Sequence, residues 1–257
     1  MNHLQRAIPH DPVLVLNPEG RSNVVVVCEH ASRFIPPEFE NLGLDDLVRQ
    51  SHIAWDPGAL GVAHGLAKCL DAKLIASNVS RLVVDCNRPP SARDAMPERG
   101  ETMDVPGNMN LTAAQRDKRT SRYYDPFHAS LGAAIAAIQD PIVVTVHSFT
   151  PIFHGTPRNV EIGILHDDDD RLANAMIQVA PSHTDLKVAI NDPYGPKDGV
   201  THTLKEHAIK VGHLNVMLEI GNDLIADAQS QDAMATCLAK WLSNALAILG
   251  VSEGVQC

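Results

Sequence analysis

Three apolar runs in the sequence each end in a histidine or a carboxylate, residue types that bind metal ions and transfer protons. The runs and their end residues are 23–28 with Glu29 and His30, 141–146 with His147, and 215–218 with Glu219. Short runs rich in β-branched residues are typical of strands buried on both faces. In open α/β sheets, ligands lie beyond the carboxyl ends of such strands. The pattern therefore indicates one site, shared by three strand ends, with a metal ion at its centre.

Neutral imidazole and carboxylate are the protein ligands of a catalytic Zn²⁺, usually three of them with a fourth position left to water. His30 and His147 are the first two candidates, for Zn²⁺ or for another divalent ion such as Co²⁺. Asp56 is the expected third ligand, and His52, one helical turn earlier, competes with it. Glu29 adjoins His30, but neighbours on a strand point to opposite faces, so both are not expected to face one ion.

Hydrolysis at such an ion also needs an oxygen base, which takes a proton from water and hands it to the leaving group. Glu219 is the candidate base, and its alternative role is a strand-end carboxylate in a salt bridge. Arg81, Asn87, Arg88 and Arg158 are candidates for substrate contacts, because guanidinium groups hold carboxylates and stabilise oxyanions. A single arginine is more often a solvated surface residue, but Arg81 and Arg88 bracket an apolar run with Asn87 beside it.

The composition limits the class of protein. The 257 residues, of which 44% are hydrophobic, fit one α/β domain over 1–257 with an irregular lead-in at 1–20. A formal net charge of -10 argues against nucleic acid as a partner, since phosphate binding needs a basic surface. A small anionic substrate remains compatible, because a few arginines can dominate the local field. The sequence predicts no particular oligomeric state.

The cysteines and the chain start bear on the compartment. The five cysteines are an odd number without CxxC spacing, which favours a reducing cytosol over a disulfide framework. The first six residues lack the apolar segment of a signal peptide, and no apolar stretch approaches the roughly 18 residues of a membrane span. We expect a soluble cytoplasmic protein without a membrane partner.

The elements that position these residues alternate between strand and helix, which predicts an α/β fold. Residues 89–110 carry little periodicity and are expected to form a long loop. Helices are expected at 44–50, from Asp56-Pro57 through Leu70, at 112–138, after the aspartate run 167–170, at 204–211 and at 229–249. Strands are expected at 72–77, 82–85, 160–165 and 186–190, besides the three apolar runs.

These motifs together resemble the N-formylglutamate amidohydrolase family, itself similar to zinc carboxypeptidases and aspartoacylases. The matching segments, in order between residues 23 and 226, are Cys28-Glu-His30-Ala-Ser, His52-Ile-Ala-Trp-Asp56-Pro, Ser80-Arg81-Leu-Val-Val-Asp85-Cys-Asn87-Arg88-Pro, Val146-His147-Ser148 and Leu218-Glu219-Ile-Gly-Asn222-Asp223, with a late segment at 198–208 that contains His202. The resemblance implies a three-layer α/β/α fold with a mixed, mainly parallel sheet.

The resemblance also implies roles for the residues. His30, Asp56 and His147 correspond to the metal ligands, Glu219 to the base and acid, and Arg81 to the arginine that polarises the scissile carbonyl. The pair Asn87-Arg88 corresponds to the grip on a substrate carboxylate, and His202 to a further substrate contact. The sequence departs from the family at Gly221, where arginine is more usual.

The implied activity is metal-dependent hydrolysis of an N-acyl amino acid, most simply N-formyl-L-glutamate to formate and L-glutamate. Two alternatives stay open. One is a hydrolase of another N-acyl amino acid, which stays open because glycine replaces the usual arginine at position 221. The other is a non-catalytic protein of the same fold that binds a small carboxylate.

Overall fold

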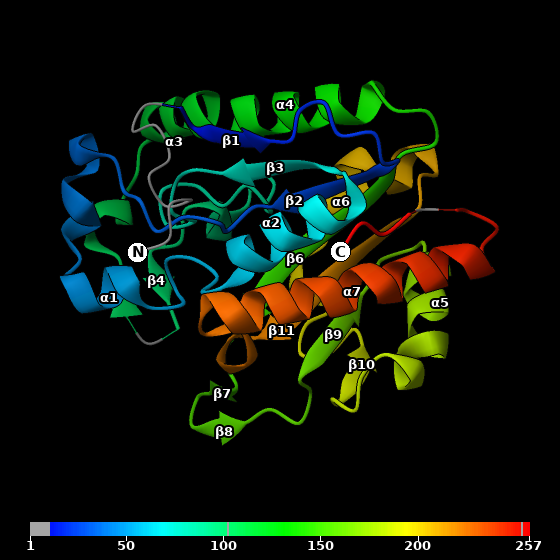
Figure 1. Ribbon diagram of the computed structural model, residues 1–257. Helices are drawn as coiled ribbons and strands as arrows, with labels where there is room; N and C mark the ends of the chain where they lie inside the picture. Colours follow the sequence, from blue (N-terminus) through cyan, green and yellow to red (C-terminus); the bar gives the residue numbers. More distant parts are fainter. Residues whose placement is uncertain (1–10, 102, 253) are drawn as a thin grey trace.

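A seven-stranded sheet forms the centre of the computed structural model, which describes residues 11–101, 103–252 and 254–257 (Figure 1). The strand order is β1-β3-β2-β6-β11-β9-β10. The pairs β1/β3 and β9/β11 are antiparallel and all other pairs are parallel. The sheet is therefore mixed and mainly parallel, as expected. Its strands are β1 (Val13–Leu16), β2 (Val24–Cys28), β3 (Lys73–Ser77), β6 (Ile142–Phe149), β9 (Ile162–Leu165), β10 (Val188–Ile190) and β11 (Asn215–Gly221).

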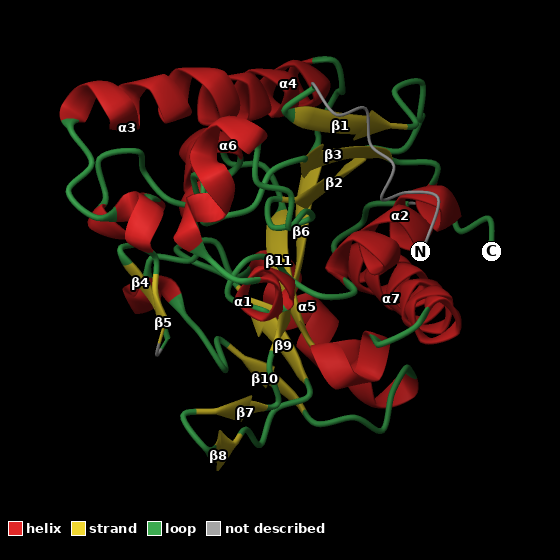
Figure 2. Ribbon diagram, turned by 90° about the vertical axis from the view of Figure 1, so that its left-hand side faces the viewer, coloured by secondary structure: helices red, strands yellow, loops and turns green. Residues whose placement is uncertain are grey.

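Helices cover both faces of the sheet, so the predicted three-layer α/β/α arrangement is confirmed (Figure 2). Helices α2, α5 and α7 pack on one face, and α4 and α6 pack on the other. Their bounds are α1 (Asp46–Gln50), α2 (Ala59–Leu70), α3 (Ala113–Arg119), α4 (Asp125–Ala136), α5 (Arg171–Val179), α6 (His202–His207) and α7 (Ala228–Ile248). A π-helical turn, Thr120–Tyr124, joins α3 to α4, and Thr112 caps α3 with a capping box.

The central strands are buried on both sides because their β-branched side chains alternate between two apolar clusters. In β2, Val24 and Val26 pack toward α2 and α7, whereas Val25 and Val27 pack toward α4. All five residues of β2 and all eight of β6 are buried. This double burial explains why both strands read as continuous apolar runs.

Two small hairpins lie outside the sheet. The segment expected to be a long loop contains the first, formed by β4 (Arg99–Gly100) and β5 (Met103–Asp104). The second follows β6 and consists of β7 (Ile152–Phe153) and β8 (Thr156–Pro157). In Figure 1 the second hairpin projects beyond the sheet on the side of β9 and β10.

Three local expectations were wrong. Within the expected irregular lead-in, of which residues 1–10 lie outside the described part, β1 adds an edge strand whose alternating side chains reach both faces. The run 82–85 is not a strand, because Val83 N–H donates to Ser80 and forms a turn. Helix α2 is capped by Gly58, with φ of 84°, rather than by Asp56, whose carboxylate lies among two histidines instead.

The cysteine expectation also needs correction, because Cys69 and Cys257 form a disulfide that ties the chain end to α2. Their sequence separation of 188 residues left no spacing signal. Cys28, Cys86 and Cys237 are free. Within the described residues, no helix combines the length and the apolar character that crossing a membrane requires.

Candidate metal centre and active site

His30, Asp56 and His147 converge at the carboxyl ends of the central strands. His147 is the sixth residue of β6, His30 follows β2, and Asp56 precedes α2. The Asp56 Oδ2 atom lies 2.9 Å from His147 Nδ1 and 3.4 Å from His30 Nδ1, and the two Nδ1 atoms are 3.1 Å apart. All three side chains are buried. The three strongest metal-ligand candidates of the sequence thus form one compact cluster.

This cluster fits a metal ion with nitrogen and oxygen ligands. Zn²⁺ bonds of about 2.0–2.1 Å in a tetrahedral site place two ligand atoms roughly 3.3 Å apart, close to the three separations here. Two imidazoles and one carboxylate are also a common donor set for catalytic Zn²⁺. Within the described residues, this is the one group of three or more candidate ligands whose donor atoms lie within 4.8 Å of one another.

A buried carboxylate lies beside the outer nitrogen of each histidine. His30 Nε2 forms a hydrogen bond of 2.7 Å with Asp85 Oδ1, and His147 Nε2 lies 3.1 Å from Glu29 Oε2 without hydrogen-bond geometry. Such partners orient a ligating ring and leave the opposite nitrogen, here Nδ1, for the metal. Sequence reasoning missed both roles, although Glu29 adjoins His30 and Asp85 lies in a motif already singled out.

The charges of the cluster depend on one another. Burial favours neutral Asp56, but His30 and His147 outweigh it and hold the pKa of Asp56 well below its usual range. Burial likewise opposes protonation of His147, yet Glu29 and Asp56 raise the pKa of His147 well above its usual range. The pKa of Asp85 stays well below normal despite burial, because His30 and Arg81 lie beside it. Asp56 and Asp85 are therefore ionised, and a proton on His147 balances part of their charge.

Glu219 faces the same site from the neighbouring strand. It is paired with His147 in the parallel register of β11 and β6, and it is 5% exposed. Its Oε2 atom is buried and has no hydrogen-bond partner among the described residues. Burial raises the pKa of Glu219 to about 7, with His147 opposing this shift and Asp56 adding to it. A carboxylate with this pKa can both accept and return a proton near neutral pH.

A cavity of about 650 Å³ opens onto these residues. Its size is typical of small-molecule sites. Three arginines and four carboxylates (Asp56, Asp192, Asp198 and Glu219) face it together with aromatic side chains, so guanidinium partners are available for an anionic group of a substrate. The residues that line it include His30, His52, Asp56, Arg81, Asn87, Arg88, His147, Phe149, Phe153, Arg158, Tyr194 and Glu219.

The three arginines differ in how many donors remain available. Arg81 contacts Asp85 at 2.8 Å and Asp56 at 3.6 Å. Arg88 donates to Asp94 and to the backbone oxygens of residues 87, 198 and 199. Arg158 stacks against three aromatic rings, at 4.7–5.2 Å from their centroids, and donates to the Tyr194 hydroxyl. Its NH1 atom is buried and has no acceptor in the described part of the chain.

Three further sequence candidates have other contacts. Asn87 lines the cavity, but its side-chain amide donates a hydrogen bond to the Val200 carbonyl oxygen and accepts one from the Thr203 N–H group. His202 is not among the cavity-lining residues and contacts the Tyr124 hydroxyl at 2.6 Å. His52 lines the cavity and pairs with Glu101 at 3.0 Å, outside the cluster of candidate ligands.

Comparison with known proteins gives the chain a family. The sequence model of the N-formylglutamate amidohydrolase family matches residues 22–226. A crystal structure of a gene product from Agrobacterium tumefaciens is 49% identical, with a TM-score of 0.92 over 95% of this chain and 98% of that one. N-formylglutamate amidohydrolase from Ralstonia eutropha JMP134 is 20% identical, with a TM-score of 0.57 over 93% and 97%, and so shares the fold. No curated protein matches. Because the family match extends over most of its length, the chain belongs to the N-formylglutamate amidohydrolase family.

Proposed function

We propose that the protein is a metal-dependent amidohydrolase that cleaves N-formyl-L-glutamate to formate and L-glutamate. The observation that carries this proposal is the buried cluster of His30, Asp56 and His147, which opens onto a cavity that also contains Glu219. Family membership supports amide hydrolysis. The cavity arginines suit a substrate with carboxylates, which is why we favour an N-acyl amino acid over an uncharged amide.

His30, Asp56 and His147 would hold Zn²⁺ or Co²⁺ through their Nδ1 and carboxylate atoms. When bound, the ion would supply a Lewis acid that activates water and polarises the amide carbonyl. Asp85 keeps the His30 ring in the orientation that this requires, because it accepts a hydrogen bond from Nε2 when Nδ1 is free of a proton.

Glu219 is the proposed proton carrier. Its Oε2 atom, which has no partner within the described ranges, gives it a free acceptor at the cavity, and its pKa of about 7 leaves a substantial ionised fraction at neutral pH. The carboxylate takes a proton from water and then gives it to the leaving nitrogen of the amino acid. Without this second transfer an amine could not depart, because an amide anion is a poor leaving group.

Arg81 is the proposed stabiliser of the carbonyl oxygen. Asp85 and Asp56 hold its guanidinium group at the cavity, and its side chain is only 28% exposed. Negative charge develops on the carbonyl oxygen as water adds, and a fixed cation nearby stabilises that charge more than it stabilises the neutral carbonyl group. This preference for the transition state is what accelerates the reaction.

Arg158 is the proposed receptor for a carboxylate of the amino acid. Its NH1 atom is a buried donor without an acceptor among the described residues, and leaving such a donor unpaired is unfavourable. Phe149, Phe153 and Tyr194 fix the plane of the guanidinium. Arg88, the carboxylate grip that the family resemblance implies, already donates to Asp94 and to backbone oxygens. We therefore propose that Asn87 and Arg88 mainly hold the loop 198–200 against the cavity.

The activity is tested with a panel of N-formyl and N-acetyl amino acids, assayed with and without added zinc or cobalt. We expect hydrolysis of N-formyl-L-glutamate in the metal-supplemented protein and none after treatment with a chelator. If only an N-acetyl substrate is hydrolysed, the acyl group of the substrate is acetyl and not formyl. Binding of N-formyl-L-glutamate without turnover under any metal would instead indicate a carboxylate-binding protein.

A further inference from the structure

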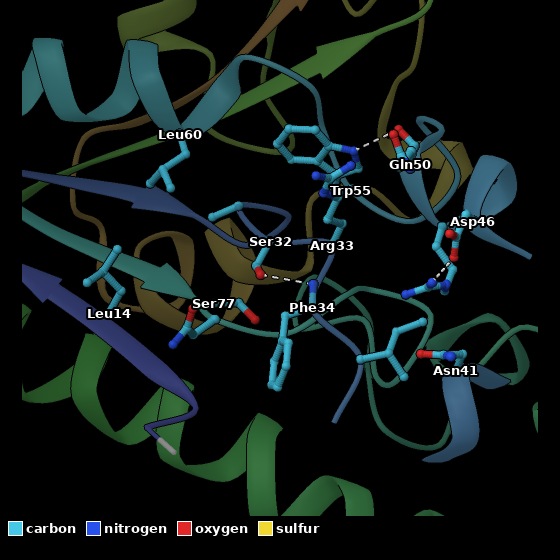
Figure 3. Close-up of a pocket in the computed structure, with 14 residues that line it drawn as sticks. Leu14, Ser32, Arg33, Phe34, Asn41, Asp46, Gln50, Trp55, Leu60 and Ser77 are labelled. Carbon is cyan, nitrogen blue, oxygen red and sulfur yellow. Dashed lines mark hydrogen bonds and ion pairs between the residues drawn. The ribbon is translucent and has the colours of Figure 1, made fainter. Parts of the chain in front are cut away.

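A second cavity of about 520 Å³ lies beside the metal centre and plays no part in the proposed reaction. It is built by the segment after β2, by α1, and by the residues that follow β3 (Figure 3). These are again the carboxyl ends of parallel strands, where α/β folds bind ligands. Its volume is within the range of small-molecule sites. We name it the effector cavity.

The effector cavity carries more positive than negative charge, in a chain whose net charge is -10. Two guanidinium groups, those of Arg33 and Arg49, line it together with one carboxylate, Asp46. Asp46 pairs with a terminal nitrogen of Arg49, but the buried Nε atom of Arg49 has no acceptor among the described residues. Arg33 is exposed and has no carboxylate partner in the described part of the chain, so its guanidinium group is free to contact a ligand. The buried Nε donor of Arg49 is the observation that favours an anion.

The rest of the lining favours an apolar or aromatic body. Leu14 and Leu60 form one wall, and Trp55 and Phe34 lie on opposite sides of Arg33 in Figure 3. Phe34 is 39% exposed, so part of its ring is accessible to a ligand. The Arg33 guanidinium carbon is 5.8 Å from the centroid of the Trp55 ring, so the cationic and aromatic surfaces adjoin.

The segments that line the effector cavity also carry metal-ligand candidates. Ala31 follows His30 directly, and Trp55 precedes Asp56 directly. The Asp56 N–H group donates to the His30 carbonyl over 2.9 Å and joins the two segments. A ligand that moves Trp55 or Ala31 therefore displaces a residue bonded to a member of the metal cluster.

We propose that the effector cavity binds a small organic anion with an aromatic or apolar body, and that the bound anion changes the metal affinity of the neighbouring cluster. The carboxylate or equivalent head group contacts Arg33 and Arg49, and the body packs against Trp55, Phe34 and Leu60. The regulatory part of this proposal rests on the proposed metal site. The binding part does not.

Trp55 makes the binding part measurable, because the chain contains only two tryptophans and Trp241 is fully buried. In a Trp241→Phe protein, 4-phenylbutyrate should change the Trp55 fluorescence with a saturable dependence on concentration. Replacing Arg33 and Arg49 together by Met should weaken binding by about tenfold or more, and the uncharged 4-phenylbutanol should bind the parent protein at least tenfold more weakly. Calorimetric titration of the unmodified chain gives the same dissociation constant without the core substitution.

The matched control is Arg158→Met, which removes a cation from the proposed active site instead. It should leave the affinity for 4-phenylbutyrate unchanged. Equal binding by the Arg33/Arg49 double variant, or weakened binding by Arg158→Met, would overturn the proposed site. For the regulatory part, saturating 4-phenylbutyrate should change the zinc dissociation constant by about threefold or more in the unmodified chain and not in the double variant. An unchanged zinc affinity with intact 4-phenylbutyrate binding would overturn regulation alone.

Discussion

The outer ring nitrogen of His30, Nε2, is hydrogen-bonded to Asp85 Oδ1 at 2.7 Å, so that Nδ1 faces Asp56 and His147. Asp85 is 2% exposed, so water cannot replace it as the partner of His30. The hydrogen bond decides which imidazole nitrogen is available as a metal ligand, and a distant part of the sequence, 55 residues away, sets it.

The first prediction follows from this hydrogen bond. Asp85→Asn keeps an acceptor of the same shape but removes the charge that makes the His30 ring more basic, so zinc affinity should fall by about 10 to 100-fold. Competition with a zinc indicator measures the affinity. Asp71→Asn is the matched control, because Asp71 pairs with the exposed Arg21 instead. Equal zinc affinity in both variants would show that Asp85 does not support the metal site.

A second prediction distinguishes Asp56 from His52 as the third ligand. Asp56 lies between the two histidines, whereas His52 pairs with Glu101 outside the cluster. Asp56→Asn should therefore weaken zinc binding beyond the roughly 100-fold typical of outer partners, and His52→Gln should change it little. The metal content of the purified variants, measured by mass spectrometry, ranks the two. The reverse ranking would make His52 the ligand.

The parts of the site that leave a local pattern of residue types could be predicted from the sequence. The strands that carry His147 and Glu219 near their carboxyl ends were recognisable as apolar runs, because burial on both faces leaves a continuous run of apolar residues. The interpretation of 82–85 failed for the same reason. Its apolar residues are buried too, but in a loop cluster where Val83 closes a turn onto Ser80, and burial alone does not distinguish strand from loop.

Other features of the site depend on contacts that leave no local pattern in the sequence. Asp56 is a residue type that often caps helices, yet its carboxylate lies beside His147, and Gly58 caps α2 instead. The aromatic contacts of Arg158 involve Tyr194, in a loop without any local signal. Arg88 donates hydrogen bonds to the Asp94 carboxylate and to the Gly199 carbonyl oxygen. None of these pairings has a sequence spacing from which it could be predicted.

The third prediction concerns substrate charge. Arg158→Lys keeps the charge but loses the planar fork, so kcat/KM for N-formyl-L-glutamate should fall by about tenfold or more. Arg88→Lys should have the smaller effect on KM if its role is to hold the loop 198–200. Steady-state kinetics with N-formyl-L-glutamate and with its two monoamide analogues check this. A larger loss of kcat/KM in Arg88→Lys, together with lost discrimination against an amide, would show that Arg88 and not Arg158 binds the carboxylate.

The fourth prediction concerns stability at acidic pH. Burial lowers the pKa of both His128 and His207 to about 4, and their facing ring nitrogens are 2.7 Å apart. The unfolded chain, with a histidine pKa of about 6.5, binds more protons between these values, so folding stability falls as pH drops from about 6.5 toward 4. Replacing both residues by Gln should shrink the loss of melting temperature between pH 7.5 and pH 5. Calorimetry on both proteins measures it, and an unchanged loss would contradict the assignment.

The most direct test is the turnover number of Glu219→Gln, determined together with its zinc content. Glutamine keeps the size of the side chain but cannot carry a proton, so kcat for N-formyl-L-glutamate should fall by about 100-fold or more. Calorimetry should still find one zinc ion per chain and a substrate dissociation constant near the parent KM, provided substrate release outpaces chemistry in the parent. Turnover within a few fold of the parent, at full zinc occupancy, would contradict proton transfer by Glu219.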